Sequence, residues 1–453
     1  MKLPSLLLLF LVTTLLFLTY PYHTAALTCY DNVNPLRRNQ HVPVECDNNK
    51  LGKRTSVSWI KGLRSWMPFA SKTLKRDVGT NAFKITLTCS AGTTLCAKVK
   101  NAFDLAGLML SQTLQLNTAI TVNATFLNFC KQMNQCTAGG GYLTLGGAAP
   151  ARTIPMKDDD QAVRLYPQAL VKQQTSDPSI NFGAYDIVAL FNSEANFWFQ
   201  GDGAIQHTQS DFLFVILHEL VHGLGFTSSW DDYINITPEA LTPDVSITSK
   251  GGQQTIGFTE YAFDKYMVLS QTGQRMSEIT AQLNQFSASS GATTVQQFGR
   301  AFKNSPQYSL AVQMFRNATT RNAMVFLPAG QSDISQAVIL ETSLAPYQQG
   351  SSVSHVDYNT YTDTPDFLMR YLQDRGVSLG DAIVQGGNYT GGSIGPKLKL
   401  VLESLGYATQ DNPNPYRPAP SSSDSPVILV QSKTLVFLIV FMTIFLSRNT
   451  WNL

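Results

Sequence analysis

Two histidines and a glutamate are grouped in one short stretch, His218-Glu219-Leu220-Val221-His222. On a helix, residues four positions apart lie on the same face, so the two imidazoles could bind one metal ion. Zinc suits this pattern because it accepts imidazole nitrogen and leaves a coordination position open for water. The glutamate directly follows the first histidine, where its carboxylate could act as a general base toward that water. The spacing therefore predicts hydrolytic metal chemistry.

The residues around this stretch predict a buried helix. Positions 212–217 are hydrophobic on every face, which is typical of a helix packed on all sides that holds its ligands rigidly. Gly223 and Gly225 then end the helix. The alternative is a core helix whose histidines are only hydrogen-bonded. The chain has only 6 histidines, however, and chance seldom places two of them at this spacing beside a glutamate. We therefore predict a zinc site.

A third protein ligand is expected, because zinc hydrolases usually supply three and leave one position open. The histidine available after the motif is His355, in the stretch SSVSHVD, and Met369 follows it at a short distance. Asp264 and Glu260 are alternative ligands, since a carboxylate oxygen also suits zinc. We favour His355 because imidazole is the commonest metal ligand in proteins.

The segments HELVHGLGF, a long insertion, SSVSHVD and finally DFLM resemble the leishmanolysin branch of the metzincin zinc endopeptidases. In most metzincins the third histidine lies soon after the helix-ending glycine, and the corresponding position here is Ser228. Leishmanolysin-like enzymes instead insert a subdomain before that histidine, and a methionine turn lies under the metal. The resemblance implies these roles: His218, His222 and His355 as zinc ligands, Glu219 as general base, Gly225 as the helix-ending glycine and Met369 as the turn methionine.

The resemblance also implies the fold and the activity. It implies an α+β, two-lobed zinc endopeptidase, with a mixed-sheet N-terminal lobe, a central zinc helix, and a largely helical or irregular C-terminal lobe with a long insertion. The implied cofactor is one Zn2+ ion, and the implied partners are protein or peptide substrates. By analogy of position with astacin-type metzincins, Tyr371 is a candidate for stabilising the oxyanion.

Two other functions fit the same residues. A glycosylated surface binding or adhesion protein could keep the fold after losing activity, and a zinc hydrolase could act on a bond other than a peptide. Glu219 argues against the inactive form, because a decayed site usually loses the base or a ligand. The net charge of +2, without a long block of Lys or Arg, gives no indication of a nucleic-acid partner.

Both ends of the chain predict passage to the cell surface or the extracellular space. Lys2 and an apolar run up to Leu18, followed by small residues, are typical of a signal peptide over 1–26. The Pro/Ser-rich stretch 408–427 is expected to be a linker, and 428–453 resembles a glycosylphosphatidylinositol-anchor signal. A transmembrane tail is the alternative, although its apolar run is shorter than the roughly 20 residues that span a bilayer.

Secretion makes the 6 cysteines candidates for disulfides, and we expect Cys29 to pair with Cys46. The basic segment 27–76 has little periodicity and ends in a dibasic pair, so it is a candidate pro-segment. A solvated loop is the alternative. Four sequons predict glycosylated surface positions. They are Asn123, Asn235, Asn317 and Asn388.

Apolar periodicity divides the remaining chain into an N-terminal catalytic lobe over 77–226, ending in the zinc helix, and the insertion with the C-terminal catalytic lobe over 227–407. The length is sufficient for a large buried core. The expected elements are strands at 83–88, 120–129, 142–145 and 185–191, and helices at 97–114, 261–269, 295–302 and 395–407.

Overall fold

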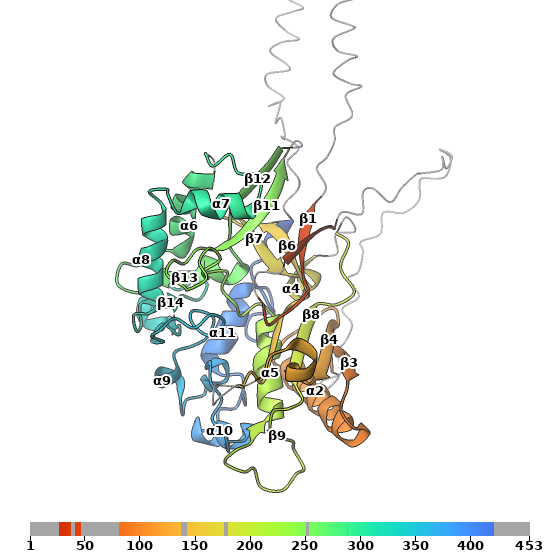
Figure 1. Ribbon diagram of the computed structural model, residues 1–453. Coiled ribbons are helices and arrows are strands. Elements are labelled where there is room, and N and C mark those ends of the chain that lie inside the picture. The colour runs from red at the N-terminus through yellow and green to blue at the C-terminus, as the bar shows by residue number, and fades with distance from the viewer. Residues whose placement is uncertain are drawn as a thin grey trace, which may run out of the picture. The chain divides into compact units, whose positions relative to one another are not determined.

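The computed structural model describes residues 27–37, 41–46, 81–136, 143–175, 180–250, 253–287 and 289–420 (Figure 1). The described chain is a mixed α/β structure with several small sheets. The predicted signal peptide over 1–26 and anchor signal over 428–453 lie outside the described residues, as does most of the candidate pro-segment. None of the described helices combines the length and apolarity needed to cross a membrane.

A four-stranded sheet with the order β3-β4-β8-β5 supports the motif helix (Figure 1). β3 (Phe83–Cys89), β4 (Ile120–Leu127) and β8 (Ile187–Asn192) are parallel, and β5 (Gly146–Pro150) is an antiparallel edge strand. Alternate residues of β4 are buried, as expected for a strand with one covered face. The covering helices are α2 (Thr93–Thr113) and α5 (Phe212–Gly223).

The expected strands at 83–88, 120–129 and 185–191 and the helix at 97–114 are confirmed within a few residues. Of the strand expected at 142–145, the described residues 143–145 are not in a strand, and β5 begins only at Gly146. β5 begins with two glycines, which have low strand propensity, so its sequence does not indicate a strand. Pairing with β8 forms the strand instead.

The helix α5 is buried as its composition predicts, and only His218 and Glu219 are partly exposed. Asp211 caps its first turn by accepting the amide of Leu213 at 2.9 Å. Gly225 follows the helix with a φ of 112°, and a Cβ there would lie 2.9 Å from Pro167 Cγ. The position therefore needs glycine for its backbone conformation and for space.

Residues 27–46 contribute two strands to a second sheet, which the low periodicity of this segment did not predict. β1 (Thr28–Asn32) pairs with β2 (His41–Glu45) and with β6 (Arg152–Lys157). The expected disulfide between Cys29 and Cys46 is present. β1 pairs with an edge of β6 and β2 pairs with β1, contacts that no local pattern encodes. Removal of the segment stays a prediction.

The segment expected to be a linker over 408–427 is partly ordered. Thr409 bridges to Leu114, and β16 (Ala419–Pro420) pairs with β6. The Tyr416 ring lies 4.0 Å from the Lys265 ammonium. The folded chain therefore continues past residue 407, because these tertiary contacts order a sequence that lacks periodicity.

The other disulfides among the described residues are Cys89–Cys96 and Cys130–Cys136.

The insertion contains the hairpin of β11 (Asp244–Lys250) and β12 (Gln253–Thr259) and several helices. The helix expected at 261–269 is only partly present, because η2 (Ala262–Tyr266) gives way to β13 (Met267–Leu269), which pairs with β14 (Met324–Phe326). The helices expected at 295–302 and 395–407 are confirmed. In the described chain, the α-helices that follow β13 are α6 (Met276–Ser287), α7 (Val295–Phe302), α8 (Tyr308–Ala318), α9 (Tyr358–Tyr361), α10 (Leu379–Gln385) and α11 (Pro396–Leu405).

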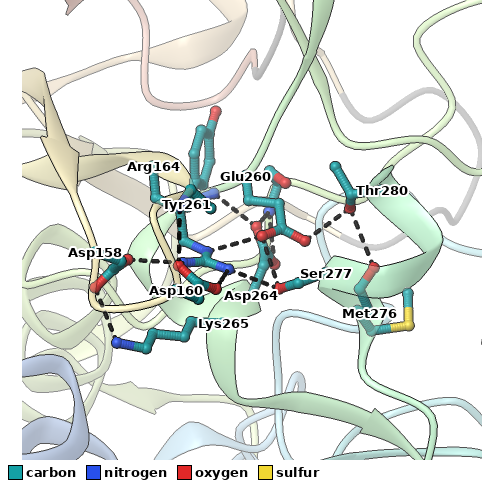
Figure 2. Close-up of polar contacts among 12 residues, drawn as sticks. Asp158, Asp160, Arg164, Glu260, Tyr261, Asp264, Lys265, Met276, Ser277 and Thr280 are labelled. Atoms are coloured by element: carbon teal, nitrogen blue, oxygen red, sulfur yellow. Dashed lines mark hydrogen bonds and ion pairs between the residues drawn. The ribbon is translucent and has the colours of Figure 1, made fainter. Parts of the chain in front are cut away.

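A buried ion-pair network joins β7 (Val163–Pro167) to the insertion, as Figure 2 shows. The Arg164 guanidinium lies 2.8 Å from the carboxylate of Asp158 and 2.8 Å from that of Glu260. It also pairs with Asp160 at 2.7 Å. Arg164 is fully buried, so these acidic partners compensate for the water it has lost.

Candidate metal centre

Three histidines from separate parts of the chain converge at one point. His218 and His222 project from successive turns of α5, and His355 comes from the loop after β15 (Val338–Ile339). Each pair of Nε2 atoms is 3.1 Å apart. Within the described chain, these residues are the only group of three or more His, Cys, Asp or Glu side chains arranged to share an ion.

Each of the three imidazoles is oriented by a backbone carbonyl at its other nitrogen. An Nδ1 that donates a hydrogen bond carries the proton, which leaves the Nε2 lone pair directed at the common point. The carbonyl oxygens belong to Leu368 at 2.8 Å from His218, Phe226 at 2.6 Å from His222 and Ser351 at 2.9 Å from His355.

Three converging lone pairs repel each other unless a cation lies between them, so this donor set fits a metal. Regular tetrahedral coordination with Zn–N distances of ~2.0–2.1 Å would separate the ligand nitrogens by about 3.3 Å. The observed separations of 3.1 Å are close to that value. Imidazole nitrogen also favours zinc over magnesium or calcium, which prefer oxygen ligands.

Glu341 positions the third histidine, and the sequence analysis did not identify it. Its amide donates to the His355 carbonyl at 2.8 Å, and its carbonyl accepts from the Val353 amide at 2.8 Å. Its carboxylate is fully buried and accepts from the Tyr358 amide at 3.0 Å and from Ser343. No motif marks this residue, because it acts through backbone pairing between segments that meet only in the folded chain.

The predicted methionine turn is the 3-10 helix η4 (Phe367–Met369), and Met369 is buried. Two backbone carbonyls of this turn hold the site together. The carbonyl of Leu368 accepts from His218, and the carbonyl of Met369 accepts from the Val356 amide at 3.0 Å. The turn therefore connects the segment of the third histidine to the motif helix.

The Glu219 carboxylate accepts a hydrogen bond at 2.9 Å from the amide of Ala148, in the edge strand β5. Burial raises the pKa of Glu219 to about 8, although the Ala148 amide opposes this shift. Burial also lowers the pKa of His218 to about 4, which keeps its imidazole neutral near pH 7. The Ala148 contact was not predicted, because only the tertiary structure brings β5 to the helix.

The two alternative ligands do not join the histidines. The Asp264 carboxylate accepts the Ser228 hydroxyl at 2.7 Å and the Ser229 amide at 3.0 Å. Glu260 pairs with Arg164 in the network of Figure 2. Ser228, where most metzincins have the third histidine, connects through its amide to Ser354 Oγ at 3.1 Å, next to His355.

The histidines and Glu219 line a cleft of about 1490 Å³. β5 lines the same cleft, as does the candidate oxyanion residue Tyr371. Tyr371 is half-buried, and its ring centroid lies 5.8 Å from that of Tyr358. The cleft therefore collects the residues predicted to do chemistry in one cavity.

The four sequon asparagines differ in exposure. Asn388 is exposed, whereas the other three are half-buried. Asn123 lies in β4, a strand with a neighbour on each side, and Asn317 lies near the end of α8. The Asn235 amide donates to the Asp232 carboxylate at 2.9 Å. Asn388 best fits a glycosylated surface position.

The sequence profile of the SPBPB7E8-like family matches residues 34–434. The chain belongs to this family. This chain is also similar to the uncharacterized protein PB7E8.01 of Schizosaccharomyces pombe, with 32% identity over 378 residues. That match covers 73% of this chain and 63% of the relative, so the chain spans less than two thirds of the relative's length. No solved structure matches the chain.

Proposed function

We propose that this protein is a secreted, cell-surface zinc metalloendopeptidase. The proposal rests above all on three Nε2 atoms that lie 3.1 Å apart while each Nδ1 faces a carbonyl. His218, His222 and His355 would hold the zinc. The bound ion would supply Lewis-acid chemistry, lowering the pKa of a water and polarising the substrate carbonyl.

The chain's own residues would move the protons. Glu219 would accept a proton from the attacking water and donate it to the leaving amine. Its Oε2 is fixed by the Ala148 amide at 2.9 Å, so the carboxylate is already oriented. Tyr371 would stabilise the negative charge that develops on the substrate oxygen.

The edge strand β5 supports a peptide as the substrate. Leu145 accepts from Asn192 and Ala151 donates to Asp186, so alternate residues between them bond to β8. Gly146 therefore directs its backbone groups away from the sheet, next to the site. An extended peptide can pair with such an edge by strand addition.

The decisive experiment uses protein secreted by eukaryotic cells. We expect it to contain one zinc ion by mass spectrometry and to cut a denatured protein. A chelator should abolish cleavage, and added zinc should restore it. Glu219→Gln should bind zinc without cleaving, whereas Glu278→Gln, at an exposed glutamate of α6, should cleave normally. Zinc binding without any cleavage by the unaltered protein would instead support the surface binding protein.

We also propose that the chain reaches the cell surface through its signal peptide and is held there by a glycosylphosphatidylinositol anchor. Phosphatidylinositol-specific phospholipase C should release the protein from cells. Retention on the membrane after this treatment would favour the transmembrane tail.

A further inference from the structure

The charged side chains that line the cleft are not balanced. The two acidic side chains of the lining, Asp374 and Glu219, already have hydrogen-bonding or ion-pair partners. The Asp374 carboxylate lies 3.1 Å from the Arg370 guanidinium and accepts the Tyr358 hydroxyl. Glu219 accepts the Ala148 amide. The charged residues of the lining, histidines aside, are Arg37, Arg370, Arg375, Glu219 and Asp374.

Arg37 and Arg375 therefore remain as the basic charges of the cleft without a carboxylate partner among the described residues. His41 also lines the cleft, but its Nδ1 lies 2.9 Å from the Asp244 carboxylate, so a charge on it would be neutralised. Arg37 and Arg375 are both exposed, so their guanidinium groups are accessible to a ligand that enters the cleft, whereas Arg164 in Figure 2 is buried and paired.

Arg37 is held at the cleft by the hairpin of β1 and β2. The disulfide Cys29–Cys46 closes the hairpin, and the Asp31 carboxylate lies 2.9 Å from Arg152 Nη2. The preceding residue, Leu36, packs over Gly147 of β5, where a Cβ would collide with its side chain. The N-terminal segment thus places Arg37 in the cleft lining, directly after a residue that packs on the edge strand.

Arg375 is held by a tight turn before α10. Gly376 follows it with a φ of 75°, and its amide donates to the Gln209 carbonyl at 2.8 Å. A Cβ on Gly376 would lie 2.8 Å from His207 Cα, so the turn packs directly on the segment that leads into α5. The backbone on which Arg375 sits is therefore fixed.

We propose that the peptidase acts on acidic peptide segments, and that Arg37 and Arg375 recognise carboxylates of residues flanking the scissile bond. This inference rests on the proposed function. A cleft lined by uncompensated charge of one sign concentrates ligands of the opposite sign. Arginine suits the role because its planar guanidinium can bind a carboxylate through two hydrogen bonds.

The test compares two peptides that differ only in glutamate or glutamine on both sides of the cleaved bond. At low ionic strength we expect kcat/KM to favour the glutamate peptide by about tenfold, mainly through KM. Arg37→Gln and Arg375→Gln should each reduce this ratio by about threefold, and the double variant should remove it. Added salt should reduce it as well. Arg300→Gln, at an exposed arginine of α7 outside the cleft, should keep the full ratio.

Binding separates this inference from the proposed function. Dissociation constants of both peptides are measured on Glu219→Gln protein, which cannot cleave. Tighter binding of the glutamate peptide, lost in the arginine variants, supports the inference even if the unaltered protein cuts neither peptide, in which case only the peptidase proposal fails. Equal cleavage and equal binding of the two peptides, or a preference that survives the double variant, would overturn the inference.

Discussion

The molecule contains two polar clusters, the network around Arg164 and the three histidines, and they differ in whether their polar atoms have complementary partners. In the network around Arg164, the buried carboxylates of Asp158 and Glu260 each lie within 3 Å of a cationic side chain (Figure 2). At the three histidines, the Nε2 atoms face each other at 3.1 Å. The charges of the first cluster are paired by its own side chains, whereas a cation between the nitrogens would relieve the repulsion in the second. We therefore propose a structural role for the first cluster and metal binding for the second.

The Arg164 network and the histidine cluster also differ in their access to solvent. Arg164 has no exposed surface, whereas the histidine cluster opens into the cleft of about 1490 Å³. A buried ion pair contributes little net stability, but removal of one partner is costly because the other charge stays buried. Changes in the two clusters should therefore have different signatures.

The largest expected effect comes from the third histidine. His355→Ala removes one of three nitrogens, so we expect at least a thousandfold (~10³) loss of peptidase activity together with loss of bound zinc. Metal content and kcat/KM are measured on the same preparation. His207→Ala, at an exposed histidine outside the cluster, is the control and should retain both. Full zinc content in His355→Ala would contradict the assigned ligand set.

Breaking the Arg164 network should affect stability instead. Arg164→Leu leaves the Glu260 carboxylate buried without an opposite charge and leaves Asp158 with Lys265 alone, so we expect the free energy of unfolding to fall by about 3–5 kcal/mol. Urea denaturation measures this fall. Arg316→Leu, on the exposed surface of α8, should change stability by less than about 0.5 kcal/mol. Zinc binding should survive in the folded fraction of both variants.

Zinc should stabilise the protein only through the histidines. Free zinc at a thousandfold excess over its dissociation constant should raise the free energy of unfolding by about 4 kcal/mol. Thermal denaturation with and without a chelator measures the shift. Arg164→Leu should show the same shift as the unaltered protein, and His355→Ala should show none. A shift in His355→Ala would indicate that zinc binds elsewhere.

Glu341 shares a property with each cluster. It is a buried carboxylate, as in the Arg164 network, and it positions His355 of the histidine cluster. Glu341→Gln weakens the hydrogen bonds to Tyr358 and Ser343, so we expect about tenfold weaker zinc affinity and a loss of about 1–2 kcal/mol of stability. Competition with a chromogenic chelator measures the affinity. An unchanged affinity with reduced stability would limit Glu341 to a structural role.

The smallest expected effect is a pH dependence at Asp264. Burial raises the pKa of Asp264 to about 7, assisted by the nearby Glu260 charge. Between the ordinary value of about 4 and this raised value the folded state binds more proton than the unfolded state, so stability falls as pH rises. We expect a slope of about 1 kcal/mol per pH unit or less, and a flatter profile in Asp264→Asn. Identical slopes in urea denaturation would refute this assignment.

Local sequence was sufficient to predict α5 and the relative placement of two of the three clustered histidines. Residues four apart on a helix must share a face, so His218 and His222 were certain to meet once the apolar run folded as a helix. Gly225 was likewise predictable, since a helix that ends in a left-handed turn needs a residue without a Cβ. The strands β3, β4 and β8 also followed from local pattern, and the disulfide Cys29–Cys46 followed from the predicted secretion.

Only the tertiary structure decided between His355 and the carboxylates as the third member of the cluster. Asp264 and Glu260 are engaged by Ser228 and Arg164, while backbone pairing with Glu341 carries the loop of His355 to the helix. The contact between Ala148 and Glu219 and the pairing of β1 with β2 and β6 arose in the same way. The physical reason is the sequence separation between the residues in contact. A helical repeat acts over a few residues, whereas these contacts join segments that no spacing along the chain relates.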